Sequence, residues 1–143
     1  MASIFISYQR KPSAMLAKLI AKELRDLGIE VYLDTERMDS AGAFPTRLVD
    51  AIRACDVFVC LVGDTTFESE WVRREIEIAH QHKRPMIPVF QESYKQIELA
   101  DAPTPYIKAL LEHDGILIFD VRGVYVDQSI EILSKMIDNT ACA

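Results

Sequence analysis

Trp71 and Glu75, four positions apart, are the residues in this sequence best suited to chemistry. They fall in a stretch with helical periodicity, so their side chains lie one above the other on the same helix face. Three other residues form the apolar stripe of that stretch, namely Val72, Ile76 and Ala79. We therefore expect Glu75 to lie off the core face and to point into a cleft. A carboxylate placed there beside an aromatic ring can stabilise a developing positive charge.

Short apolar runs alternate along the chain with stretches of helical periodicity. The apolar runs predict five strands, at residues 3–8, 29–34, 55–62, 84–90 and 115–121. The periodic stretches predict helices from Pro12 to Leu27, from Phe44 through Ile52, from the N-cap Ser69 to about His82, near residues 107–111, and from the cap Asp127 onward.

The residues of two predicted strands indicate where those strands lie in the sheet. The run at residues 55–62 is almost continuously apolar and rich in β-branched residues, which is typical of a central strand covered on both faces. The run at residues 84–90 contains Pro88, which favours an edge strand or a bulge because proline lacks a backbone N–H.

The alternation of strands and helices predicts an α/β fold of one domain over residues 1–143. Right-handed crossovers would give a flavodoxin-like three-layer fold, in which a five-stranded parallel sheet has helices on both faces. Ligands bind such sheets beyond the carboxyl ends of the strands. We therefore expect a cleft assembled from the loops at residues 9–13, 34–44, 63–71 and 91–98.

Composition and missing motifs narrow the function classes. The net charge of −6 argues against a general nucleic-acid or anionic-membrane surface. No arrangement of the five glycines makes a dinucleotide-binding or P-loop motif, and there is no GxSxG motif. The end of the first strand also lacks the acidic cluster with which a receiver domain binds magnesium.

No metal site and no disulfide framework are predicted. The three cysteines are scattered, and Cys55 and Cys60 fit buried free thiols in or beside an apolar run. His80, His82 and Lys83 fit the basic end of a helix better than a metal cluster. No signal peptide is recognisable, and no apolar run approaches the ~20 residues that span a bilayer, so a reducing cytoplasm is the expected compartment.

Four short motifs, in this order and spacing, resemble Toll/interleukin-1 receptor (TIR) domains over nearly the whole chain. They are FISY at residues 5–8, VYLD at 31–34, GAF at 42–44 and WVRRE at 71–75. The resemblance is closest to the enzymatic branch of the family, which includes animal axon-degeneration NADases and bacterial immune effectors. That branch carries a glutamate four residues after a tryptophan on the third helix.

The resemblance implies an enzyme that cleaves the nicotinamide–ribose bond of NAD⁺, with NAD⁺ as substrate and no cofactor. Glu75 would be the catalytic residue. The residues that the resemblance assigns to substrate binding are Tyr8, Arg10, Asp34, Arg37, Phe44 and Trp71.

Each of these assignments has a structural alternative. Glu75 could be a solvated charge on a helix, and Arg10 a surface cation. Trp71 and Phe44 could serve only in packing, and Asp34 could cap the loop that follows it.

A single carboxylate would suffice for this reaction. Ordinary glycoside hydrolysis needs two carboxyl groups because the leaving oxygen must be protonated. Nicotinamide departs neutral from a pyridinium without protonation, so only the oxocarbenium-like ribose has to be stabilised. Water or the adenine end of the same molecule could then capture the ribose, which would give ADP-ribose or a cyclic ADP-ribose.

The resemblance also implies partners. TIR domains self-associate, and residues 35–44 are the expected assembly surface. A sensor, either fused to a longer protein from which this domain was cut or carried by a separate molecule, would activate it in anti-phage or cell-death signalling. The alternative to an enzyme is a TIR scaffold that signals only by homotypic association.

Overall fold

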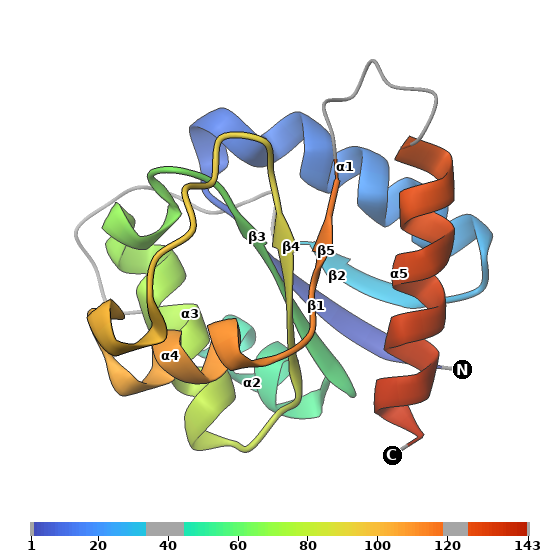
Figure 1. The fold of residues 1–143 in the computed structure, drawn as a ribbon. Coiled ribbons are helices and arrows are strands. Elements are labelled where there is room, and N and C mark those ends of the chain that lie inside the picture. Colours follow the sequence, from blue (N-terminus) through green and yellow to red (C-terminus); the bar gives the residue numbers. More distant parts are fainter. Residues whose placement is uncertain (1, 34–44, 119–125, 143) are drawn as a thin grey trace.

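The computed structural model describes residues 2–33, 45–118 and 126–142. Its strands are β1 (Ser3–Ser7), β2 (Glu30–Leu33), β3 (Val57–Val62), β4 (Met86–Phe90) and β5 (Ile116–Leu117). Its helices are α1 (Arg10–Asp26), α2 (Thr46–Ala54), α3 (Glu70–Gln81), α4 (Pro105–Glu112) and α5 (Val126–Ala141), with short 3₁₀ turns at η1 (Thr66–Glu68) and η2 (Leu99–Asp101). Strands and helices alternate around one sheet (Figure 1).

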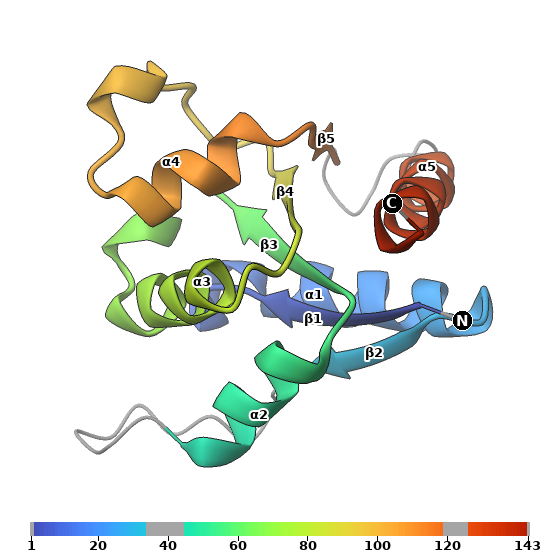
Figure 2. The ribbon, with the colours of Figure 1, turned by 90° about the horizontal axis from the view of Figure 1, so that it is seen from below.

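The sheet has the order β2-β1-β3-β4-β5, and every neighbouring pair is parallel. Helices α2, α3 and α4 pack on one face, while α1 and α5 pack on the other (Figure 2). The predicted flavodoxin-like three-layer fold is therefore confirmed. The chain direction across the sheet reverses between β1 and β3, and ligands of such folds bind at this switch point.

The core consists of two clusters that the sheet separates. All six residues of β3 are buried, as predicted for the central strand. On the face covered by α2 and α3, the ring of Phe5 stacks on Tyr32 with a centroid distance of 5.3 Å and on Phe58 at 5.7 Å. This row of rings joins three adjacent strands beneath the helix that carries Trp71 and Glu75.

The beginning of α1 differs from the sequence-based expectation. The helix begins at Arg10, two residues before Pro12, because Gln9 has an extended backbone and its carbonyl accepts the first helical hydrogen bond, from Ser13 N at 3.1 Å. Proline is tolerated in a first turn, where its missing N–H has no helical partner to lose. Arg10 is thus a helical residue at the carboxyl end of β1.

The prediction of an edge strand or bulge at Pro88 is wrong, because β4 lies between β3 and β5 and its register with β3 continues without a break through Pro88. The physical reason is the shortness of β5. Its ladder pairs only with Val89 and Phe90, so it begins just beyond the proline. At Pro88 the neighbour on that side is Gly115 rather than a hydrogen-bonded strand residue.

Gly115 allows this close approach, and Gly115→Ala is expected to destabilise the domain. A Cβ atom at Gly115 would collide with the Pro88 carbonyl oxygen and would lie 2.7 Å from Pro88 Cγ and 2.9 Å from Phe90 Cε2. We expect the free energy of unfolding to fall by about 1–3 kcal/mol, measured by urea denaturation. Gly63→Ala is the control, because the nearest atoms to its Cβ would be side-chain ends of Ser93 and Gln91 rather than a backbone oxygen. An equal loss in both variants would contradict the argument.

Candidate active site

Helix α3 carries the Trp71–Glu75 pair, and its start is defined by a side-chain cap. Ser69 Oγ accepts a hydrogen bond from Val72 N at 3.3 Å, as the sequence predicts. Glu70 in the first turn adds a negative charge where the helix dipole favours one. The chain therefore enters α3 in a defined way one residue before Trp71.

Glu75 lies in a buried environment at the end of β1. Its side chain is only 2% exposed, and its Oε1 accepts a hydrogen bond from Ser7 Oγ at 2.9 Å. Ser7 is fully buried and is the last residue of β1. The carboxylate is thus held at the carboxyl edge of the sheet, beside the switch point.

This position corrects the expectation that Glu75 lies off the core face of α3. At about 100° per residue, Glu75 is only about 60° from Val72 and about 40° from Ala79 around the helix. Both of those residues are fully buried, and the buried arc of α3 also includes Ile76 and Ile78. The apolar stripe is therefore wider than the three residues that defined it, and Glu75 falls within it.

Three of the four loops expected to form a cleft are joined by hydrogen bonds in the described structure. Thr65 Oγ1 donates to Gln9 Oε1 at 2.8 Å, which ties the loop after β3 to the loop after β1. Ser13 Oγ donates to Gln91 Oε1 at 2.7 Å, which ties α1 to the loop after β4. The remaining loop, at residues 34–44, lies outside the described residues.

The other proposed binding residues do not all gather around Glu75. Trp71 is half-buried and packs against the core on the α3 face of the sheet. Arg10 is exposed at the first position of α1. Tyr8 is 4% exposed and packs into the core on the opposite face, with α1 and α5. Asp34, Arg37 and Phe44 lie outside the described residues.

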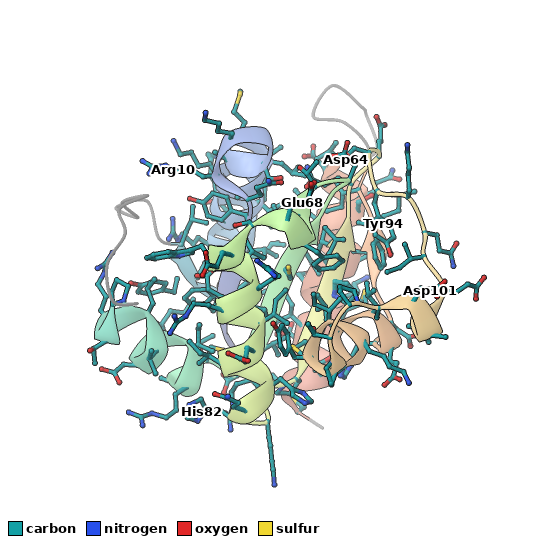
Figure 3. The ribbon with its side chains drawn as sticks, turned by 90° about the vertical axis from the view of Figure 1, so that its left-hand side faces the viewer. Arg10, Asp64, Glu68, His82, Tyr94 and Asp101 are labelled. Atoms are coloured by element: carbon teal, nitrogen blue, oxygen red, sulfur yellow. The ribbon has the colours of Figure 1, made fainter. Side chains whose placement is uncertain are left out.

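Figure 3 relates the labelled charged residues to α3. The side chains of Arg10, Asp64 and Glu68 lie toward the end of the molecule where α3 begins, whereas His82 lies at the other end of that helix. Trp71 is the second residue of α3, so it lies at the end of the helix that faces Arg10.

The sequence analysis did not single out Ser7 as a functional residue, although a signal was available. Side chains in a strand alternate between faces, so Phe5 and Ser7 share one face of β1. A serine on a face that is otherwise apolar is expected to have a hydrogen-bond partner when buried. That partner is Glu75.

The described residues contain a cavity of about 580 Å³, but it does not adjoin Glu75. Its lining combines the end of β4 and the following loop with one residue each of α4 and β5, and it includes Phe90, Tyr94, Leu99, Leu111 and Leu117. Within residues 2–33, 45–118 and 126–142, no three His, Cys, Asp or Glu side chains are grouped as a metal site would require. The helices in those ranges include none with the length and apolarity to cross a membrane.

The carboxylate of Glu75 affects a neighbouring thiol. Ser7 and Cys60 are partners in the β1–β3 register, and both are fully buried. Burial raises the pKa of the Cys60 thiol well above its usual range, the negative charge of Glu75 raises it further, and a hydrogen bond with Ser7 lowers it. Cys60 therefore remains a neutral thiol at physiological pH.

Thiol labelling is expected to find one reactive cysteine in the native domain. Cys142 is exposed, whereas burial raises the pKa of Cys55 to about 11 and holds that of Cys60 higher still. Because the thiolate is the reacting species, a chromogenic disulfide reagent at neutral pH should modify one thiol rapidly and all three in guanidinium chloride. Cys142→Ser should remove the rapid phase. A second rapidly reacting thiol in the native protein would contradict the burial.

Comparison with known protein families identifies the family of this chain. The family model described as TIR domain matches residues 4–127, which include Ser7, Trp71 and Glu75. The chain belongs to the TIR domain family. The motifs at residues 5–8 and 71–75 are thus motifs of a TIR domain, in which Ser7 contacts Glu75.

The TIR domain has relatives named as NAD⁺ hydrolases. "NAD(+) hydrolase tir-1" of Caenorhabditis elegans is 26% identical over 121 residues, covering 79% of this chain and 12% of the relative. "NAD(+) hydrolase sarm1" of Drosophila melanogaster is 27% identical over 149 residues, covering 96% of this chain and 11% of the relative. The chain therefore spans about an eighth of the length of these two proteins.

A plant relative and two solved structures extend the comparison. "Probable 2' cyclic ADP-D-ribose synthase BdTIR" of Brachypodium distachyon is 27% identical over 77 residues, covering 54% of this chain and 34% of the relative. A TIR-STING receptor from C. gigas superposes with a TM-score of 0.60 at 22% identity, over 92% of this chain and 39% of the other. The TIR domains of the Roq1 resistosome superpose with a TM-score of 0.54 at 14% identity, over 99% and 84%. These structures share the fold.

Proposed function

We propose that this TIR domain is an NAD⁺ nucleosidase and that Glu75 is its catalytic residue. The observation that carries the proposal is a glutamate one helical turn after a tryptophan, hydrogen-bonded to Ser7 at the carboxyl edge of a parallel sheet. The relatives named as NAD⁺ hydrolases and as a cyclic ADP-ribose synthase support the same reaction class.

In this proposal the bond between nicotinamide nitrogen and ribose C1′ breaks, and its electron pair goes to the nitrogen. The pyridinium thereby becomes neutral nicotinamide, so no acid is needed at the leaving group. Glu75 stabilises the positive charge that develops on the ribose, an interaction that is stronger in a dry site than in water. Water then bonds to C1′ and releases one proton, which gives ADP-ribose. Attack by the adenine end of the same molecule gives cyclic ADP-ribose instead.

The remaining contacts in the proposal follow the chemistry of the substrate. Arg10 is exposed at the start of α1, where a guanidinium can pair with the pyrophosphate. Trp71, one turn before Glu75, offers an aromatic face to a ring of the substrate. The resemblance to TIR enzymes assigns further contacts to Tyr8, Asp34, Arg37 and Phe44, although Tyr8 would act from the opposite face of the sheet.

Activity in this proposal depends on assembly. The domain associates with further TIR domains through a surface that includes residues 35–44, and a fused or separate sensor triggers this association. The output is loss of NAD⁺ or production of a nucleotide signal in cytoplasmic anti-phage or cell-death signalling.

A non-enzymatic scaffold is the second candidate, and the burial of Glu75 favours it. A side chain that is 2% exposed cannot contact a substrate until the residues that cover it move. A scaffold would use the same helix only for packing and would signal by TIR–TIR association.

The two candidates differ in one measurement. The concentrated domain, and the domain fused to an inducible dimerisation module, are incubated with NAD⁺, and the products are separated by chromatography. The enzyme is expected to release nicotinamide together with ADP-ribose or a cyclic isomer, and Glu75→Ala to release none. No turnover even when the domains are forced together would favour the scaffold, whereas unchanged release by Glu75→Ala would refute the role of Glu75.

A further inference from the structure

The hydroxyl of Ser7 contacts the proposed catalytic carboxylate directly. Its Oγ donates to Glu75 Oε1 at 2.9 Å, and both side chains are at most 2% exposed. Ser7 ends β1, which has β2 on one side and the fully buried β3 on the other. The donor is therefore anchored on a strand that has a paired neighbour on each side.

The neighbours of Ser7 favour the hydrogen bond that its hydroxyl donates to Glu75. The neighbouring polar side chain on β3 is Cys60, which is in register with Ser7. Because burial raises the pKa of Cys60, this thiol stays protonated and does not compete as an anion for the hydroxyl proton. A hydrogen bond to a carboxylate is stronger than one to a neutral acceptor. The hydroxyl of Ser7 therefore donates its hydrogen bond to Glu75 rather than to Cys60.

We infer that Ser7 is a positioning residue, whose hydroxyl fixes the orientation of the Glu75 carboxylate for the cleavage of NAD⁺. The inference rests on the proposed function, and it adds a residue on β1 to a site otherwise carried by α3. Glutamate has three side-chain torsions, and packing against apolar neighbours does not set the rotation of its carboxylate plane. A directed hydrogen bond from a buried internal strand does set it, as a pre-organised site requires.

The expected result of Ser7→Ala is a selective loss of turnover. We expect kcat to fall by roughly 10²-fold, the order of loss that misplacement of a catalytic group produces, while KM changes little. Ser7→Thr retains the hydroxyl and should preserve most of the activity. Ser7→Cys replaces the hydroxyl with a slightly larger thiol that is only a weak donor, so its kcat should fall as well, measured with a reductant present.

Ser3→Ala is the matched control on the same strand. Ser3 Oγ also donates to a carboxylate, Asp56 Oδ2 at 3.3 Å, but at the amino end of β1. This variant also loses a serine-to-carboxylate hydrogen bond from β1, in this case an exposed one, and should retain the wild-type kcat. A general loosening of the strand would lower the activity of both variants, whereas a positioning role lowers only that of Ser7→Ala.

The outcomes separate this inference from the proposed function. If wild type releases no nicotinamide under any condition, the proposed function fails. If wild type is active and folded Ser7→Ala, verified by circular dichroism, retains its kcat, only the role of Ser7 is overturned. If Ser7→Ala does not fold, Ser7→Cys decides, and a wild-type kcat for Ser7→Cys overturns the inference.

Discussion

Glu75→Gln is expected to lower the rate of nicotinamide release by about 10²–10³-fold, as removal of a pre-organised electrostatic group typically does. Glutamine preserves the size of the side chain and can still accept from Ser7, so the substitution removes the charge while retaining the shape and one acceptor. Steady-state kinetics with NAD⁺ would measure the loss, which should appear in kcat because the charge acts on the transition state.

Glu77→Gln is the matched control for this substitution. Glu77 lies on the same helix, two residues further on, and is only partly buried. The change of charge and of residue type is identical, so the control should keep the wild-type rate. Glu75→Asp should retain part of the activity only if the shortened side chain still reaches the ribose. Comparable losses in Glu75→Gln and Glu77→Gln would assign the effect to the charge of α3 rather than to a catalytic carboxylate.

Phe58→Ala is expected to have the largest effect on stability. Phe58 is fully buried on the central strand, and its ring stacks on Phe5 with a centroid distance of 5.7 Å. Truncation leaves a cavity between β3 and the helices above it, and such changes cost about 3–5 kcal/mol. The whole free energy of unfolding of a domain is about 5–15 kcal/mol, so the midpoint of urea denaturation should fall sharply.

Met15→Ala provides the comparison for Phe58→Ala. Met15 is a large apolar residue on α1 that is 78% exposed, so its truncation should change the free energy of unfolding by less than about 0.5 kcal/mol. Equal midpoints for the two variants would mean that Phe58 does not pack as the structure describes.

The fold could be predicted because each element has a local signal. The continuous apolar run of β3 indicates burial on both faces, and Ser69 marks the start of α3. The sequence-based predictions were wrong where the structure of a residue depends on a neighbour that is distant in the sequence. Pro88 is accommodated in an internal strand because β5 begins one residue later, and the length of β5 cannot be read from the run around Pro88.

The candidate site could be predicted only where its residues have a local sequence signal. The spacing of Trp71 and Glu75 places them on one face of α3, and the motifs identify the family. The burial of Glu75 could not be predicted from an apolar stripe of three residues, because the contact surface of α3 is wider than its apolar residues. The contact with Ser7 joins residues 68 positions apart, so no local pattern encodes it.

The hydrogen bond between Ser7 and Glu75 has a consequence for inhibition. This hydrogen bond connects β1 to α3, so it forms only while α3 remains packed against β1. The bond length of 2.9 Å leaves little tolerance, since a displacement of about 1 Å exceeds the usual range of such bonds. A molecule that binds between α3 and a neighbouring helix and displaces α3 would therefore inhibit the proposed enzyme without occupying the NAD⁺ site. Such inhibition would be non-competitive, so excess substrate would not overcome it.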